Sequence, residues 1–224
     1  MLNLSSNMNR KFWVAFILII VGVLGFAIVQ SKNNAQTTRK IENPKIVQAD
    51  DHIRGKTDSK VFLITYGDYE CPACNAWEPE LEKIREEYND RVAFIFRNFP
   101  LTDKHINAFA AARAAESAAL QGKFWEMHDL LYARWAEWRG DNKSAQGKFE
   151  GYAEELGLDM TKFKEDYKSE GVADRVNSDL SSANEVGATG TPTFIVNGEI
   201  RETGTVTEGK NKLKQILDQE LAKQ

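Results

Sequence analysis

The two cysteines of the chain, Cys71 and Cys74, form the motif Cys-Pro-Ala-Cys. Two thiols at this spacing are compatible with three kinds of chemistry: thiol–disulfide exchange, metal binding and a structural cross-link. The histidines and the elements around the motif decide among these.

Metal binding is the weakest of the three interpretations. A structural zinc site normally takes four cysteine or histidine ligands, and this motif supplies two. The three histidines, His52, His105 and His128, lack the paired spacing that accompanies such cysteines. We expect His52 to be a solvated linker residue and His128 to be a core residue, and we predict no metal site.

A purely structural disulfide is also disfavoured. A bond between Cys71 and Cys74 closes so short a loop that it restricts the unfolded chain little. Thiol–disulfide exchange is therefore the favoured chemistry for this pair.

The cysteines are placed by a strand and a helix. Residues 60–69 are apolar and rich in β-branched and aromatic side chains, which predicts a buried strand. Apolar residues recur every three or four positions over 71–88, which predicts a helix. The run 91–100 predicts a second strand, and the β-α-β order implies that the two strands are parallel within one sheet.

A helix N-terminus suits a reactive thiol pair. Residues three apart share one face there, so both sulfurs come within bonding distance. Unpaired N–H groups and the helix dipole stabilise a thiolate, which lowers a cysteine pKa from about 8.5 to between ~3.5 and ~7.5. Pro72 fits a first turn that uses no backbone N–H. We expect Cys71 to be the exposed nucleophile and Cys74 its buried resolving partner.

The later sequence predicts a helical insertion and a closing half. Several helices are expected between about 102 and 186, one of them capped by Asp159. Asn197-Gly198 then predicts a two-residue hairpin turn, and residues 205–224 predict an amphipathic helix. The element order is that of an α/β domain with a helical insertion.

Together these features resemble the thioredoxin superfamily. Pro79, eight residues after the first cysteine, stands where that superfamily has a helix-kinking proline. The segment GATGTPTFIVNG resembles its cis-proline loop, which makes Pro192 the candidate cis-proline and Thr191 the residue before it. The insertion is typical of DsbA-like thiol–disulfide oxidoreductases, and the sequence is similar to the membrane-anchored, BdbD-like members. The resemblance covers roughly 59–224 and implies a thioredoxin-like fold, with the insertion between the β-α-β half and the cis-Pro β-hairpin-α half.

The resemblance implies an enzyme that oxidises cysteine pairs of exported proteins to disulfides. The Cys71–Cys74 disulfide would be its redox group, with no bound cofactor. Its partners would be unfolded exported proteins with cysteine thiols, and a DsbB-like, quinone-linked membrane oxidase that reoxidises it. The alternatives are a membrane-anchored reductase, as in cytochrome maturation, and a non-catalytic peptide-binding chaperone.

The resemblance also implies which residues bind substrate or tune the redox pair, namely Pro72, Ala73, Thr191, Pro192 and Asp68. Ala73 replaces the histidine of the DsbA dipeptide, so we expect a thiolate less stabilised than in DsbA. The buried acid of DsbA-type sequences, six residues before the first cysteine, corresponds to Thr65. Asp68 and Glu70 are nearer the motif, either as proton acceptors or as surface carboxylates at a strand end.

The tryptophans near the site are of two kinds. Trp77 and Trp125 occur at helical spacing with other apolar residues, so we expect both to pack in the core. We expect Trp135 and Trp138 to be partly exposed, as candidate walls of a substrate groove.

The N-terminus contains an uncharged apolar run at residues 12–29. In a helix it would span roughly 27 Å, close to the ~30 Å hydrocarbon core of a bilayer. We favour a retained single-span anchor within 1–30 over a cleaved signal peptide, whose apolar core needs only ~7–15 residues. Residues 31–58 would form a polar linker, and the domain at 59–224 would be extracytoplasmic. The net charge of −4, without blocks of like charge, argues against a nucleic-acid partner.

Overall fold

The computed structural model describes residue 16, residues 43–140 and residues 145–224. The predicted anchor at 12–29 lies outside these residues except for Phe16. Within the described part of the chain, no helix is both long enough and apolar enough to cross a bilayer.

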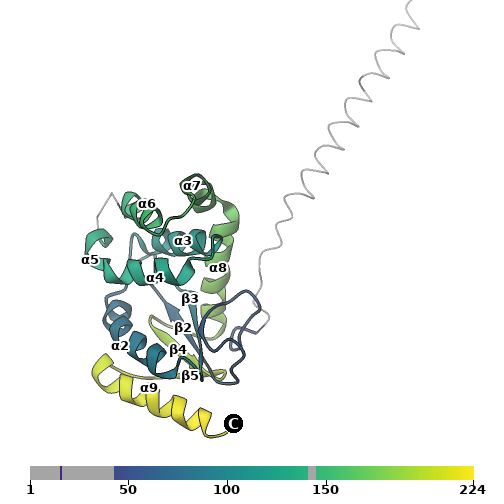
Figure 1. Ribbon diagram of the computed structural model, residues 1–224, viewed down its shortest axis with the longest axis vertical. Helices are drawn as coiled ribbons and strands as arrows, with labels where there is room; N and C mark the ends of the chain where they lie inside the picture. Colours follow the sequence, from purple (N-terminus) through teal and green to yellow (C-terminus); the bar gives the residue numbers. More distant parts are fainter. Residues whose placement is uncertain (1–15, 17–42, 141–144) are drawn as a thin grey trace, which may run out of the picture. The chain divides into compact units, whose positions relative to one another are not determined.

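A five-stranded sheet forms the centre of the domain, in the order β1-β3-β2-β4-β5. Figure 1 labels β2, β3, β4 and β5. The strands are β1 (His52–Gly55), β2 (Phe62–Gly67), β3 (Ala93–Asn98), β4 (Thr193–Val196) and β5 (Glu199–Arg201). The helices are α2 (Pro72–Tyr88), α3 (Ala108–Ala119), α4 (Phe124–Ala133), α5 (Trp135–Trp138), α6 (Ala145–Glu155), α7 (Met160–Lys168), α8 (Glu170–Glu185) and α9 (Val206–Leu221).

The pairing of the strands confirms the predicted β-α-β unit. β2 and β3 are parallel, and α2 connects them. β4 pairs antiparallel with β2, and β5 pairs antiparallel with β4. The predicted hairpin turn is present, with positive φ at both Asn197 (47°) and Gly198 (85°), as a two-residue turn of this kind requires.

Alternate residues of the central strands face opposite sides of the sheet. Leu63 and Phe94 pack with α2 and α9 on one face. Ile64 and Ile95 pack with α8 on the other. Because both faces of the sheet are covered, the sequences of β2 and β3 are continuous apolar runs and do not alternate between apolar and polar residues.

The helices between β3 and β4 form the predicted insertion, with a core of their own (Figure 1). Alanines of α3 fill the middle of that core, and their small side chains let the neighbouring helices approach closely. Asp159 caps α7, as predicted, by accepting from the N–H groups of Thr161 and Lys162. Cys71 and Cys74 belong to the same buried cluster, so the active-site helix begins where sheet and insertion meet.

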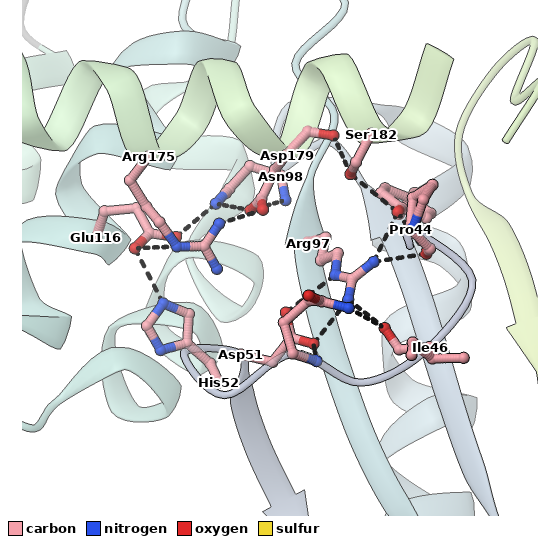
Figure 2. A network of polar contacts seen from close by, with 12 residues as sticks. Pro44, Ile46, Asp51, His52, Arg97, Asn98, Glu116, Arg175, Asp179 and Ser182 are labelled. Atoms are coloured by element: carbon pink, nitrogen blue, oxygen red, sulfur yellow. Dashed lines mark hydrogen bonds and ion pairs between the residues drawn. The ribbon is translucent and has the colours of Figure 1, made fainter. Parts of the chain in front are cut away.

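The linker expected over 31–58 needs correction for its described part, 43–58. β1 lies in this range and pairs antiparallel with β3, so His52 lies in a strand rather than in a solvated linker. His52 stacks on Phe124 at 3.7 Å and bonds to Glu116 at 2.9 Å. Figure 2 shows this segment bound to the domain by polar contacts. Several polar groups of this segment are therefore paired with the domain, although each of its residues is exposed or half-buried.

Candidate active site

Cys71 and Cys74 lie at the first turn of α2. Cys71 is the N-cap residue, with φ −67° and ψ 124°, and its carbonyl accepts from Asn75 N at 3.0 Å. Both cysteines are free thiols. Cys71 is 7% exposed and Cys74 3% exposed, so the nucleophile predicted to be exposed is only slightly more accessible than its partner. Pro72 and Ala73, which lie between the two cysteines, are exposed.

The Cys71 thiol is acidic. Its pKa is lowered to about 5, chiefly by the hydrogen bond from the Cys74 thiol. Burial opposes this change, while the Thr191 side chain and the backbone N–H groups of Cys74 and Ala73 reinforce it. The arrangement is that of a helix N-terminus stabilising an anion.

The Cys74 thiol has the opposite character. Its pKa is raised well above the ordinary value because burial disfavours the thiolate, and the hydrogen bond and charge of Cys71 act in the same direction. One thiol of the pair is therefore poised to be a thiolate at neutral pH and the other to keep its proton.

The loop before β4 places a second chain segment beside the sulfurs. The Thr191–Pro192 peptide bond is cis, as the resemblance implied. The Cys71 thiol donates to the Thr191 carbonyl at 3.5 Å. The β2–β4 pairing explains this proximity, because β2 leads into the cysteine loop and β4 begins directly after Pro192.

A groove of about 820 Å³ opens along this loop. Ala73 and Trp77 of α2 line one side, and Thr191 and Pro192 line the other together with residues 200–206. Trp77 is otherwise buried, as predicted, against Phe194. Exposed Ala73, two residues after Cys71, lines the groove, so an extended polypeptide could lie against it with a thiol near Cys71.

Asp68 and Glu70 are buried, which excludes the alternative that they are surface carboxylates. Asp68 accepts from the N–H groups of Glu70 and Leu101, each at 2.8 Å, and pairs with His105 Nδ1 at 2.7 Å. Because these three donors occupy its carboxylate, Asp68 is held as a structural anchor of the loop before Cys71.

Glu70 connects that loop to the insertion. Its two oxygens accept from the N–H groups of Asn107 and Gly140, both at 2.6 Å. Its carbonyl accepts from Trp135 Nε1 at 3.1 Å. Sequence reasoning missed this role because the partners are distant in the chain.

The aromatic residues proposed as groove walls are placed differently from each other. Trp138 is fully buried and donates to the Leu131 carbonyl at 2.9 Å, so the prediction that it is partly exposed is wrong. Trp135 is half-buried against the loop before Cys71, under the guanidinium of Arg139. Trp125 is half-buried and packs against the core of the insertion, in the packing role that was predicted for it.

One cluster has the side chains of a metal site. Glu78, His128 and Asp129 can each bring a ligand atom within 4.8 Å of the others. The carboxylates already pair with arginines, however: Glu78 with Arg85, and Asp129 with Arg54 at 2.7 Å. Two guanidinium groups beside the cluster oppose a bound cation, so we assign it no metal.

Three comparisons with known proteins bear on this site. Residues 48–218 match the family model described as Thioredoxin. The curated relatives include a protein named Na(+)/H(+) antiporter NhaA 1 from Salinispora arenicola, 41% identical over 148 residues, covering 66% of this chain and 22% of that protein. Another, Na(+)/H(+) antiporter NhaA from Herminiimonas arsenicoxydans, is 31% identical over 201 residues, covering 87% and 31%. The chain thus spans less than a third of the length of these relatives.

The similar solved structures include thiol–disulfide exchange proteins. BdbD from Bacillus subtilis in its oxidised form has a TM-score of 0.65 and 24% identity, covering 77% of this chain and 93% of that one. α-DsbA1 from Wolbachia pipientis has a TM-score of 0.67 and 19% identity, covering 80% and 94%. At these identities the likeness shows the fold.

Proposed function

Because the chain belongs to the thioredoxin family, we propose that it is a thiol–disulfide oxidoreductase acting through Cys71 and Cys74. The observation that carries the proposal is the contrast between the two thiols: an acidic Cys71 beside the groove, and a buried Cys74 that retains its proton. In such a pair the acidic thiol acts as the nucleophile or leaving group, and the buried thiol acts as the resolving group.

The exchange consists of two displacements at sulfur. A substrate thiolate attacks Cys71 Sγ of the disulfide, forming a mixed disulfide, and Cys74 Sγ leaves with the electron pair of the broken bond. A second substrate thiolate then attacks the substrate sulfur of the mixed disulfide, and Cys71 leaves as a thiolate. The substrate loses two electrons and gains a disulfide, while the protein gains both electrons as a dithiol. The low pKa of Cys71 makes it a good leaving group in the second step.

The direction we propose is oxidation of exported proteins. A Cys71 pKa of about 5 supports it, because stabilising the reduced form as a thiolate makes the disulfide a stronger oxidant. The groove fits an extended, unfolded substrate, which it would bind largely through its backbone. We propose a DsbB-like, quinone-linked membrane oxidase as the partner that restores the disulfide, and no bound cofactor.

Reduction in the opposite direction is the second candidate function, since it uses the same chemistry. The reduction potential of the Cys71–Cys74 pair distinguishes the two directions. An oxidase is expected nearer the ~−120 mV of DsbA, and a reductase nearer the ~−270 mV of thioredoxin. A potential at or below the thioredoxin value would contradict the proposed direction.

Substitution of each cysteine tests the exchange itself. Cys71→Ser is expected to abolish oxidation of a reduced, unfolded protein, measured as loss of its free thiols. Cys74→Ser is expected to accumulate mixed disulfides with substrate, visible on non-reducing gels. If the Cys71→Ser variant still oxidises substrate, the pair is not the redox centre, and the chaperone alternative becomes the better account.

The apolar run at 12–29 supports a further proposal, a single-span anchor with the catalytic domain outside the cytoplasm. An anchor would hold the domain close to a membrane-bound oxidase. The full chain should then remain in the membrane pellet after carbonate extraction; its release would contradict the anchor.

A further inference from the structure

The turn that leads into Cys71 is built around one buried carboxylate. Asp68 Oδ1 accepts from the N–H of Glu70 at 2.8 Å, and the Asp68 carbonyl accepts from the N–H of Cys71 at 3.1 Å. The first bond closes an Asx turn, and the second closes a β-turn over residues 68–71. The conformation of Asp68 therefore determines where Cys71 stands as the N-cap of α2.

The other oxygen of this carboxylate is held by a separate segment, residues 101–107 between β3 and α3. Asp68 Oδ2 accepts from the N–H of Leu101 at 2.8 Å and lies 2.7 Å from His105 Nδ1. A carboxylate only accepts hydrogen bonds, so the imidazole is the donor. The Asp68 side chain has no exposed surface, whereas that of His105 is 16% exposed. His105 therefore lies between a buried carboxylate and the surface.

The same segment also holds Glu70, the residue directly before Cys71. Glu70 Oε2 accepts from the N–H of Asn107 at 2.6 Å. The segment is tightened by a turn of its own, in which the N–H of His105 donates to the Leu101 carbonyl at 2.9 Å. Leu101, His105 and Asn107 thus grip both carboxylates of the turn, and we call them the 101–107 clamp.

The acidity of Cys71 depends on how accurately this turn places its sulfur. The backbone N–H groups of Ala73 and Cys74 stabilise the thiolate. Such hydrogen bonds weaken steeply when the distance or angle changes, so a turn that moves loses part of this stabilisation. Ala73 also supplies no imidazole where the DsbA dipeptide has one. The geometry of the turn therefore carries more of the acidity here than in a motif with its own cation.

We propose that His105 is a positioning residue for the reaction: by donating to Asp68 it fixes the turn over 68–71 and holds the Cys71 thiolate at the N-terminus of α2. This rests on the proposed thiol–disulfide exchange. The role of His105 is geometric, because it acts through Asp68 and takes no part in proton transfer to either cysteine. The imidazole that the active-site motif lacks is thus present in a neighbouring segment, where it is bonded to the turn.

Titration of the Cys71 thiol in the reduced protein tests the proposal. Thiolate formation is followed by its ultraviolet absorbance as a function of pH, and the same protein with Cys71→Ser supplies the baseline. Cys74 does not interfere, because burial raises its pKa well above the ordinary value. The unsubstituted protein is expected to titrate with a midpoint near pH 5.

Three substitutions of His105 separate the hydrogen bond from the side chain that makes it. His105→Leu removes the donor, so its midpoint is expected to rise by about 0.5 pH unit or more, the effect of one hydrogen bond passed on to the thiolate. His105→Ala is measured beside it in case the leucine side chain disturbs the fold. His105→Asn can still donate from its side-chain amide, so it is expected to keep the midpoint of the unsubstituted protein.

A redox equilibrium gives a second readout, in which two glutathione thiols reduce the Cys71–Cys74 disulfide and become one glutathione disulfide. A less stabilised thiolate makes the protein disulfide a weaker oxidant. The equilibrium constant for this reduction at neutral pH is therefore expected to fall by about 3-fold or more in His105→Leu and His105→Ala, which is the fold-change that corresponds to the shift in midpoint. It is expected to stay unchanged in His105→Asn.

His52→Leu is the matched control. His52 pairs with Glu116 at 2.9 Å, and the two side chains are 18% and 4% exposed, close to the 16% and 0% of His105 and Asp68. The pair joins β1 to α3, outside the turn that holds Cys71. The control is expected to lower the free energy of unfolding and to leave the Cys71 midpoint unchanged, which separates positioning from general stability.

Three results would overturn the positioning role. The first is a midpoint in His105→Leu and His105→Ala equal to that of the unsubstituted protein. The second is an equal rise in His105→Asn, which would mean that the hydrogen bond is not what acts. The third is an equal rise in His52→Leu. Failure of the proposed function looks different, because the unsubstituted protein itself would then titrate near the ordinary value of about 8.5.

Discussion

At the scale of single residues, the site shows how a thiol becomes acidic without a histidine beside it. Ala73 lacks the imidazole of the DsbA dipeptide, yet the pKa of Cys71 is about 5. The Cys74 thiol, the Thr191 side chain and two backbone N–H groups stabilise the thiolate instead. The value lies between the ~3.5 of DsbA and the ~7 of thioredoxin, as expected for a site that keeps the helix N-terminus and lacks the extra cation.

This pKa predicts how the stability of the reduced protein depends on pH. The folded state holds the Cys71 thiolate down to about pH 5, whereas the unfolded chain binds a proton below about pH 8.5. The stabilisation is therefore complete above the unfolded pKa and is lost as the pH falls through the folded value. The raised pKa of Cys74 acts only above the unfolded value, so it leaves this window unchanged.

Urea unfolding of the reduced and oxidised proteins at pH 5, 6.5 and 8 checks the expectation. The free energy of unfolding of the reduced form, relative to the oxidised form, is expected to rise with pH across this range. The oxidised protein is the control because it has no Cys71 thiol to titrate. A difference that does not change with pH would mean that the folded thiol is not acidic.

At the scale of elements, the sequence correctly predicted the features that depend on interactions between neighbouring residues. The β2-α2-β3 unit, the Asn197-Gly198 turn and the Asp159 cap each depend on residues close together in the chain. The placement of Cys71 and Cys74 at the start of α2 was predictable for the same reason, because the thiols and the helix N-terminus are neighbours in sequence.

The features that were predicted wrongly or missed from the sequence depend on partners that are distant in the chain. β1 is a short polar strand that becomes regular only by pairing with β3. Trp138 lies beside charged residues in sequence but is buried by the fold of the insertion. The burial of Glu70 is compensated by the N–H groups of Asn107 and Gly140, and nothing in its immediate sequence indicates them. The Glu78–His128 pair belongs to the same class, since α2 and α4 are separated by a strand and a helix.

At the scale of the whole molecule, buried polar networks hold the N-terminal segment and the insertion to the sheet (Figure 2). Asn98 of β3 donates to Glu116 of α3 at 2.7 Å and to Asp179 of α8 at 3.2 Å. Arg175 of α8 pairs with the same two carboxylates. The insertion is thereby fixed to the strand that lies next to the active-site strand, β2.

Arg97 holds the segment that precedes β1. Its side chain is fully buried and bonds to both oxygens of Asp51, at 2.9 and 2.7 Å. It also donates to the carbonyls of Pro44 and Ile46, at 2.6 and 2.8 Å, and to the Tyr66 hydroxyl at 2.8 Å. A buried guanidinium depends on such partners, because the charge has lost its water.

Removing the carboxylate should therefore destabilise the whole domain. Asp51→Ala leaves Arg97 buried without its counter-ion, which is expected to lower the free energy of unfolding by about 3–5 kcal/mol. That is a large part of the ~5–15 kcal/mol typical of a domain, so the variant should unfold at much lower urea. Asp90→Ala is the control: Asp90 is 83% exposed in its pair with Arg91, and its loss should change the free energy by less than about 1 kcal/mol. Equal unfolding midpoints for the two variants would show that residues 43–51 are a dispensable linker, as their sequence alone indicated, rather than part of the folded domain.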